Sequence, residues 1–302
     1  MGSIGTLVAC ILAGVLLKRS GVLQSDDATA FNKLIIYFFI PVISLLHIPT
    51  MTLNSDLIWL SISPFIVFLA AFLFFGLFRS TSLISKESSA ALTLTCGISS
   101  TSFVGFPIFE MLYGDQGLSY GIFLSLGGTI LVFNTIGIGY LLMYSSKSTM
   151  SWSLMMEKFF SFFPFIVFVI ALLCNVLEIS FHSSATKILR QLASPFSVIA
   201  LLAIGLQMEL KTFTDYKFEI LIGQLFKLVL APLIIYLIVW VIFGRTDLLA
   251  KICVLGAGIG SMNAISILAA EKNVQPKLSI LMPAIGIPLS VFSLFIIDNL
   301  LN

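Results

Sequence analysis

The chain has 302 residues, of which 59% are hydrophobic and only 10% are charged, and its formal net charge is +2. Its mean hydropathy is +1.10. A soluble domain of this length does not need so much apolar surface, so the composition excludes an ordinary soluble enzyme or binding module.

Apolar segments recur along the whole sequence. Each holds roughly 20 residues, the length that crosses about 30 Å of hydrocarbon. Short polar stretches with turn and charge signals separate them, and none is long enough for a second domain. The sequence therefore predicts one all-α polytopic membrane domain over residues 1–302. The predicted spans, about ten in number, are 3–17, 30–48, 57–78, 88–113, 119–143, 157–177, 188–208, 217–243, 249–271 and 277–297.

The basic residues indicate an orientation. In the first span Lys18 and Arg19 follow the apolar run, which is the reverse of a cleavable signal peptide. Eleven Lys and Arg residues lie in or beside the odd-numbered loops and four in or beside the even-numbered ones. Because positive residues stay in the cytoplasm, both termini are expected on the non-cytoplasmic side. The plasma (inner) membrane is the default location.

The ten spans divide into two sets of five. We expect a first repeat over about 1–144, a short cytoplasmic loop over about 145–156, and a second repeat over about 157–302. Because each set has an odd number of spans, the second repeat would be inverted relative to the first. The fourth and ninth spans would then occupy matching positions.

The fourth span has a polar and flexible centre, from Gly97 to Pro107. Pro107 disfavours helical geometry at Phe106, and Gly105 relaxes the backbone beside it. Lipid cannot satisfy freed backbone groups, so irregular backbone at this depth must be buried in protein or line a cavity. We therefore predict a broken helix and a substrate site. Its candidate residues are Ser100, Thr101, Ser102, Gly105 and Pro107.

The ninth span contains G-x-G-x-x-S at Gly256, Gly258 and Ser261. A dinucleotide loop would need a soluble βαβ unit and an acidic residue about 20 positions further on, but that position falls in another apolar run. We interpret the segment as a second broken helix, although small residues also serve close helix packing. The candidate substrate-binding residues here are Gly258, Gly260, Ser261 and Asn263.

Two ionisable residues stand out within the predicted spans. Lys227 lies about ten residues into the eighth span, where a cation is expensive and is usually paired or functional. It is a candidate anion ligand, with a lysine that snorkels to the interface as the alternative. Glu110 is a candidate for proton or charge coupling with Lys227, and an interfacial carboxylate is the alternative. Two half-helix N-termini near one point would also favour an anion.

No pattern typical of catalysis is present. The histidines have no ligand companion at metal-binding spacing, and the cysteines are scattered singly inside the spans. We predict no metal site, no cofactor, no enzymatic activity and no nucleic-acid partner, which leaves the lipid bilayer and a small-molecule substrate as partners. The residues concerned are His47, His182, Cys10, Cys96, Cys174 and Cys253.

Four segments resemble the auxin efflux carrier family, in order and over nearly the whole chain. They are AGVLLKRSGVLQSDDATAFNKLIIYFFIPVISLL, STSFVGFPIFEMLYG, FKLVLAPL and GSMNAISILAAEKN. The second resembles the fourth-span motif N-T-G-F-x-G-x-P, with Ser100 and Ser102 in place of the asparagine and glycine. In the fourth segment, Gly260 and its neighbours replace the usual prolines.

The resemblance implies a ten-helix inverted-repeat carrier whose fourth and ninth spans cross at the substrate. The contacting positions would be Ser100 to Pro107 and Gly258 to Asn263. Plant members export auxin, and bacterial relatives are associated with malonate, malate and similar organic anions. A homodimer is suggested by the resemblance alone.

The function hypothesis is a secondary active transporter, an exporter of a small organic anion such as a carboxylate or an auxin-like acid. It would work by alternating access around the two-helix crossover. Two alternatives stay open: a sodium-coupled organic-anion symporter of the bile-acid type, and a non-transporting membrane sensor or assembly subunit.

Overall fold

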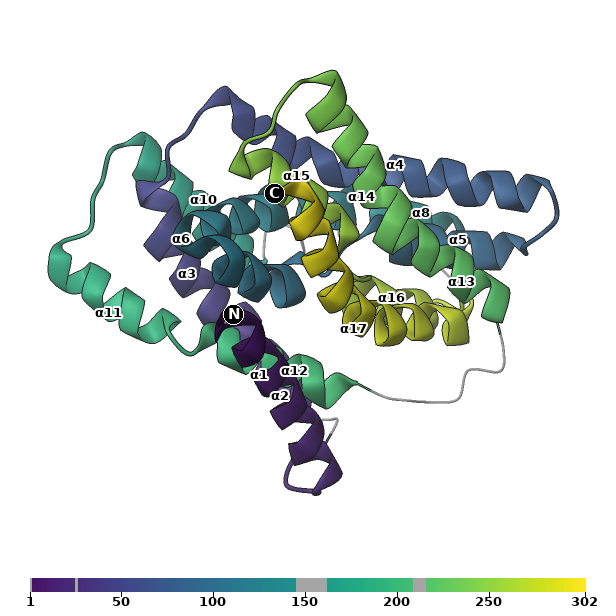
Figure 1. Cartoon of the computed structure of the whole chain (residues 1–302), viewed down its shortest axis with the longest axis horizontal. Helices are drawn as coiled ribbons and strands as arrows, with labels where there is room; N and C mark the ends of the chain where they lie inside the picture. The colour runs from purple at the N-terminus through teal and green to yellow at the C-terminus, as the bar shows by residue number, and fades with distance from the viewer. Residues whose placement is uncertain (1, 25–26, 145–161, 209–215) are drawn as a thin grey trace. The chain divides into compact units, whose positions relative to one another are not determined.

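The computed structural model describes residues 2–24, 27–144, 162–208 and 216–302 (Figure 1). All regular elements within these ranges are helices, which confirms the all-α prediction. The predicted loop 145–156 and the first residues of the sixth predicted span lie outside the described residues. The chain divides into two compact units. Unit 1 is Met1–Ser55, Ser102–Ile122 and Met156–Met208, and unit 2 is Asp56–Thr101, Phe123–Met155 and Glu209–Asn302.

Within the described residues, six helical stretches are long and apolar enough to cross a membrane. Two shorter apolar helices, Phe163–Val176 and Leu248–Gly258, accompany them. The protein is therefore described as an integral membrane protein, while the count of ten crossings and the inverted repeat stay predictions. The six stretches are Asp27–Thr50, Ser55–Ser80, Thr101–Tyr144, Ser183–Gln207, Lys217–Ile242 and Pro276–Leu301.

The stretch Thr101–Tyr144 is not one straight helix. Gly114 has φ 62° and ψ −152°, a conformation that only glycine adopts readily, and it lies in the predicted connection YGDQG. Two π-helical turns, Ser125–Thr129 and Phe133–Gly137, follow within the same stretch. The two apolar runs predicted on either side of residue 114 are thus separated by the non-helical backbone of Gly114.

Unit 1 is built from α-helices joined by short π-helical and 3₁₀ turns. Its helices α1 and α12 lie side by side. Asn175 of α10 donates to the carbonyl oxygens of Ile48 and Met51, both at 2.7 Å, and so holds the end of the second predicted span. The elements are α1 (Gly2–Arg19), α2 (Asp27–Leu34), η1 (Ile35–Phe39), α3 (Ile40–His47), η2 (Ile48–Thr50), η4 (Thr101–Gly105), α6 (Phe106–Leu124), α10 (Phe163–Val176), α11 (Ser183–Ala193) and α12 (Phe196–Gln207); η4 begins in unit 2, and α6 ends there.

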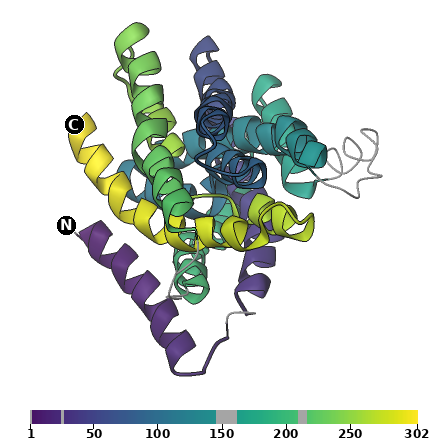
Figure 2. The same ribbon diagram turned by 90° about the vertical axis from the view of Figure 1, so that its right-hand side faces the viewer.

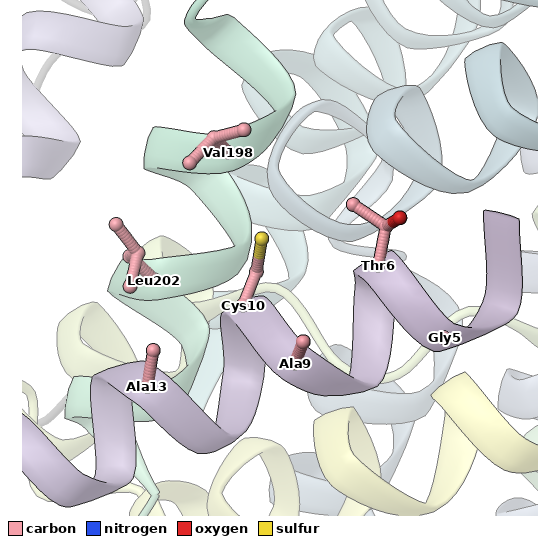
Figure 3. Close-up of a pocket in the computed structure, with 7 residues that line it drawn as sticks. All are labelled: Gly5, Thr6, Ala9, Cys10, Ala13, Val198 and Leu202. Carbon is pink, nitrogen blue, oxygen red and sulfur yellow. The ribbon is translucent and has the colours of Figure 1, made fainter. Parts of the chain in front are cut away.

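Small residues let α1 and α12 approach each other closely. A Cβ added to Gly14 would lie 2.4 Å from the carbonyl oxygen of Leu202, and one added to Gly205 would lie 2.2 Å from that of Ile11. Small residues at such a contact are the usual means of close packing between membrane helices. Figure 3 shows the neighbouring groove between the two helices, with Cys10 as one of its small lining residues.

Replacing Gly205 with alanine is expected to destabilise unit 1. The new methyl group would press on a backbone oxygen, which cannot rotate away, and overpacking of this kind costs about 1–3 kcal/mol. Thermal unfolding of the detergent-solubilised protein measures the effect. Gly5→Ala on α1 is the matched control, because its Cβ would meet nothing within 4 Å. Equal unfolding temperatures for the two variants would contradict the predicted contact.

Unit 2 holds the remaining helices. Both views place α13 beside α17, and α17 also contacts α5, α15 and α16 (Figures 1 and 2). Phe74 and Phe75 of α4 pack on Phe226, with ring centroids 5.2 and 5.3 Å away. The elements are η3 (Ser55–Leu57), α4 (Ile58–Ser80), α5 (Lys86–Gly97), η5 (Ser125–Thr129), α7 (Ile130–Val132), η6 (Phe133–Gly137), α8 (Ile138–Tyr144), α13 (Lys217–Leu225), η7 (Phe226–Leu230), α14 (Ala231–Ile235), η8 (Tyr236–Ile242), α15 (Leu248–Gly258), α16 (Asn263–Glu271) and α17 (Pro276–Leu301); η3 begins at the last residue of unit 1.

The helices α5 and α15 begin in the same way. Ser85 accepts a hydrogen bond from the backbone N–H of Ser88, and Asp247 accepts one from that of Ala250, each at 3.0 Å. Such N-caps satisfy amide groups that have no partner within the helix. Arg245 pairs with Asp56 and Asp247, and these carboxylates raise the pKa of its guanidinium. Both helices therefore have a capped first turn.

Candidate functional site

Both α5 and α15 end inside their apolar segments, at Gly97 and Gly258. The chain then runs extended through 98–100 and 259–262, two segments that we call the paired breaks. They lie antiparallel and exchange backbone hydrogen bonds, from Ser100 to Gly260 at 2.9 Å and from Met262 to Ile98 at 3.0 Å. Each break thus satisfies polar backbone groups of the other, which lipid cannot do.

The backbone of α17 lies directly against the second break. A Cβ on Gly260 would be 2.7 Å from the carbonyl carbon of Gly286 and from the amide nitrogen of Ile287. At Gly258, by contrast, the nearest atom would be the end of the Ile297 side chain at 3.2 Å. The two candidate glycines therefore differ. Gly260 is required by a backbone contact, whereas a Cβ at Gly258 would press only on the end of a flexible side chain.

Lys227 lies in the π-helical turn η7 and is completely buried. Its ammonium nitrogen donates to the hydroxyl oxygen of Ser99 at 2.7 Å. Its burial and this hydrogen bond place the ammonium beside the first break. Ser99 lies two residues beyond the last residue of α5, where the partial negative charge of a helix C-terminus stabilises a cation.

Unit 2 holds further buried polar groups on the elements that carry Lys227 and the paired breaks or next to them. The hydroxyl of Ser261 and the side-chain oxygen of Gln224 are buried and have no hydrogen-bond partner among the described residues. The Gln224 amide nitrogen donates to the carbonyl of Met282 at 3.1 Å. The hydroxyls of Thr101 and Thr129 are 3.1 Å apart. Buried polar groups normally have partners, so the unsatisfied oxygens indicate a place for a ligand or water.

A small cavity adjoins Ser99 and Thr129. Its volume is about 10 Å³, enough for about one water molecule. Its walls include Pro64 of α4 and Gly256 of α15. An organic acid does not fit in this cavity.

The remaining candidate residues belong to unit 1, because the division between the units follows Thr101. Ser102 and Gly105 lie in η4, and Pro107 is the second residue of α6, a position where proline is well tolerated. The departure from α-helix thus lies before Pro107, from residue 98 to residue 105. Gly105 at its end and Pro107 just beyond it are the residues that were predicted to disturb the helix, and the backbone exchange between the breaks accompanies the departure.

Glu110 is half-buried on α6 and accepts a hydrogen bond from the hydroxyl of Ser197. Lys227, with which it was suggested to couple, donates to Ser99. The structure thus gives each of the two ionisable residues a hydroxyl partner. Ser100 and Thr101 are 3% and 2% exposed, and Asn263 is the first residue of α16.

Two residues of the site escaped sequence reasoning. Ser99 precedes the predicted Ser100 and carries no signal that distinguishes it from the other small polar residues of the segment. Thr129 follows two glycines in the fifth predicted span. Only the folded arrangement shows that Ser99 accepts a hydrogen bond from Lys227 and that the hydroxyls of Thr129 and Thr101 are in contact.

The comparison with known families decides the class of protein. The model of a family described as membrane transport protein matches residues 2–158, more than half of the chain and all of the first break. The chain belongs to this family, that of the auxin efflux carriers. The resemblance predicted from the four sequence motifs is thereby confirmed, and the protein is a membrane transporter, not an enzyme.

Similar transporters occur in archaea and bacteria. An uncharacterized transporter of Methanothermobacter thermautotrophicus is 24% identical over 283 residues, which are 92% of this chain and 91% of the relative. The uncharacterized transporter YfdV of Escherichia coli is 24% identical over 287 residues, 92% and 90% of the two chains. One of Methanocaldococcus jannaschii is 24% identical over 230 residues, 74% and 73% of the two.

Proposed function

We propose that this membrane transporter is a secondary active carrier that exports a small organic anion. The observation that carries the proposal is the fully buried ammonium of Lys227 at the first of the paired breaks. The substrate would be a carboxylate or an auxin-like acid. It would bind at the paired breaks and at the adjoining residues Ser102, Gly105 and Pro107, with Glu110 as a possible site of proton coupling.

The distribution of buried charges supports an anionic substrate. Lys227 is the one lysine or arginine among the buried side chains of the described residues, and no aspartate or glutamate is buried with it there. An ammonium has three donors, and Ser99 accepts one of them. Burying an unpaired charge is expensive, so a carboxylate that binds beside Lys227 would remove much of that penalty.

The N-terminus of α16 also favours an anionic substrate. The helix α16 begins at Asn263, directly after the second break, so its free N–H groups present a partial positive charge there. Ser261 adds a hydroxyl without a partner among the described residues. A sodium ion at the same place would be repelled by the ammonium, which argues against the sodium-coupled alternative.

The closed cavity supports alternating access. A site with space for about one water must open before an organic acid enters. We propose that the bundle that holds the paired breaks moves against the remainder of the chain and exposes the site to each side in turn. A plasma-membrane location, termini on the non-cytoplasmic side and a homodimeric assembly belong to the same proposal.

The test is electrical. Purified protein on a solid-supported membrane is challenged with monocarboxylates, dicarboxylates and indole-3-acetate, with and without sodium or proton gradients. We expect a saturable current for one class of anion. Asn263→Ala should lower the apparent affinity about tenfold or more, because a hydrogen bond to a charged group contributes about 1.5–3 kcal/mol.

The matched control is Asn299→Ala, an exposed asparagine near the end of α17, which should transport normally. If Asn263→Ala transports every anion as the wild type does, the site assignment is wrong. A current that requires sodium would favour the symporter alternative. Silence in both transport and binding assays would reject the organic-anion proposal and direct attention to neutral substrates.

A further inference from the structure

A second cavity, of about 340 Å³, lies between α4, α5 and α8 of unit 2, three helices labelled in Figure 1. It has a basic, hydroxyl-rich part and an aromatic, apolar part, and it is far too large for a single water. The function proposed above does not use it. Its lining residues are Phe72, Gly76, Arg79, Ser80, Ser89, Tyr140 and Tyr144.

Two cations meet at one tyrosine of this cavity. The Arg79 guanidinium donates to the Tyr144 hydroxyl at 3.2 Å, and the Lys86 ammonium lies 5.3 Å from the centroid of the same ring. Neither cation forms a salt bridge with any residue that the structure describes. No carboxylate is among the described residues that line the cavity. Like charges held together in this way favour an anion between them.

The N-terminus of α5 adds to the positive potential beside the cavity. Lys86 is the first residue of α5, so the N-terminal amide groups of that helix lie at the same end of the cavity. The nearest acid in sequence, Glu87, is exposed and is rotated by about 100° from Lys86 around the helix. Tyr140 donates to the Tyr144 hydroxyl at 3.4 Å, so both phenols help to fix the polar part.

The apolar part continues onto a bare face of α4. Phe72 lines the cavity and is 44% exposed, and the nearby Leu69 is 56% exposed. Gly76 lies between Phe72 and Arg79 along the helix, and a Cβ there would meet nothing within 4 Å. A ligand therefore has room to extend from the two cations along α4.

We propose that this cavity binds the phosphate headgroup of an anionic membrane phospholipid, with an acyl chain against the exposed face of α4. Arg79 would bind phosphate oxygens through its planar fork, and Lys86 would add a point charge. The turn between α4 and α5 is predicted to be cytoplasmic, and the cytoplasmic leaflet carries the anionic lipids. The same phosphate chemistry is offered by free phosphate, but the apolar extension favours a lipid.

The test compares two lipids and one soluble anion. Purified full-length protein is titrated with phosphatidylglycerol, with phosphatidylcholine, or with inorganic phosphate, and binding is measured by native mass spectrometry and by thermal stabilisation. We expect preferential binding of phosphatidylglycerol. Arg79→Gln and Lys86→Gln should each weaken it about fivefold, as expected for one cation near a lipid headgroup. The exposed Lys217→Gln is the charge control and should bind normally.

A second variant keeps Arg79 and Lys86 and fills the open part of the cavity beside Gly76. Gly76→Leu would fill the open part of the cavity without a backbone clash, so it should fold and lose the lipid. Gly139→Leu on α8 is its control, because a Cβ there also meets nothing within 4 Å. Equal binding of both lipids, or unchanged phosphatidylglycerol binding in Gly76→Leu, would overturn the proposal. So would a site that takes inorganic phosphate but no lipid.

Discussion

Replacing Lys227 with methionine is expected to abolish transport and leave the protein folded. Methionine has a similar length and shape but no charge, so it fills the same buried space beside Ser99. The hydroxyl of Ser99 would lose its partner, at about 1–3 kcal/mol. Against this, the variant no longer buries an ammonium, and replacing a buried charge by an apolar group is often neutral or stabilising.

The effect on the anion should be large. A charge-assisted hydrogen bond contributes about 1.5–3 kcal/mol, so substrate affinity should fall about 10- to 100-fold. Binding measured by calorimetry and currents measured on a solid-supported membrane give affinity and turnover separately. Lys217→Met, an exposed lysine at the start of α13, controls for the loss of one positive charge and should transport normally.

A structural role for the lysine predicts a different pattern. If Lys227 only stabilises the C-terminal end of α5, Lys227→Met will unfold at a lower temperature and bind the anion with unchanged affinity. Adding Ser99→Ala then gives a double-mutant cycle, which isolates the coupling between the two side chains. A loss of affinity in Lys227→Met that persists in the Ser99→Ala background would show that the ammonium contacts the substrate itself.

Much of the fold could be predicted from the sequence because its signals are local. Apolar length and turn residues predicted the helical runs, and the connection near Gly114 coincides with a backbone conformation that only glycine adopts readily. The segments around Gly97 and Gly258 drew attention because glycine and serine are out of place within apolar runs. Each of these inferences needs only neighbouring residues.

The rest depends on pairing between distant segments. Ser99 and Ser261 are brought together by antiparallel pairing of their backbones. Neither segment contains a sequence signal that identifies the other as its partner. The depth of Lys227 was ambiguous for the same reason, since a long flexible side chain can reach an interface or a buried hydroxyl.

Alanine at position 260 is the second substitution with a large expected effect. Its Cβ would be 2.7 Å from two backbone atoms of α17, at Gly286 and Ile287, and backbone atoms cannot move aside as a side-chain tip can. Overpacking typically costs about 1–3 kcal/mol. To relieve this clash, either α17 or the second break would have to move. A shift of the break would weaken the hydrogen bond from Ser100 to the Gly260 carbonyl.

Gly260→Ala should therefore unfold at a lower temperature and lose transport even where it remains folded. Gly139→Ala is the control for both readouts. Gly258→Ala serves as a comparison for stability alone, since its Cβ would meet only the end of the Ile297 side chain, at 3.2 Å. If Gly260→Ala is as stable as Gly258→Ala, the backbone contact with α17 is not as close as described. If it is less stable but transports normally, the geometry of the paired breaks does not determine substrate binding, and the site must be sought elsewhere in the membrane domain.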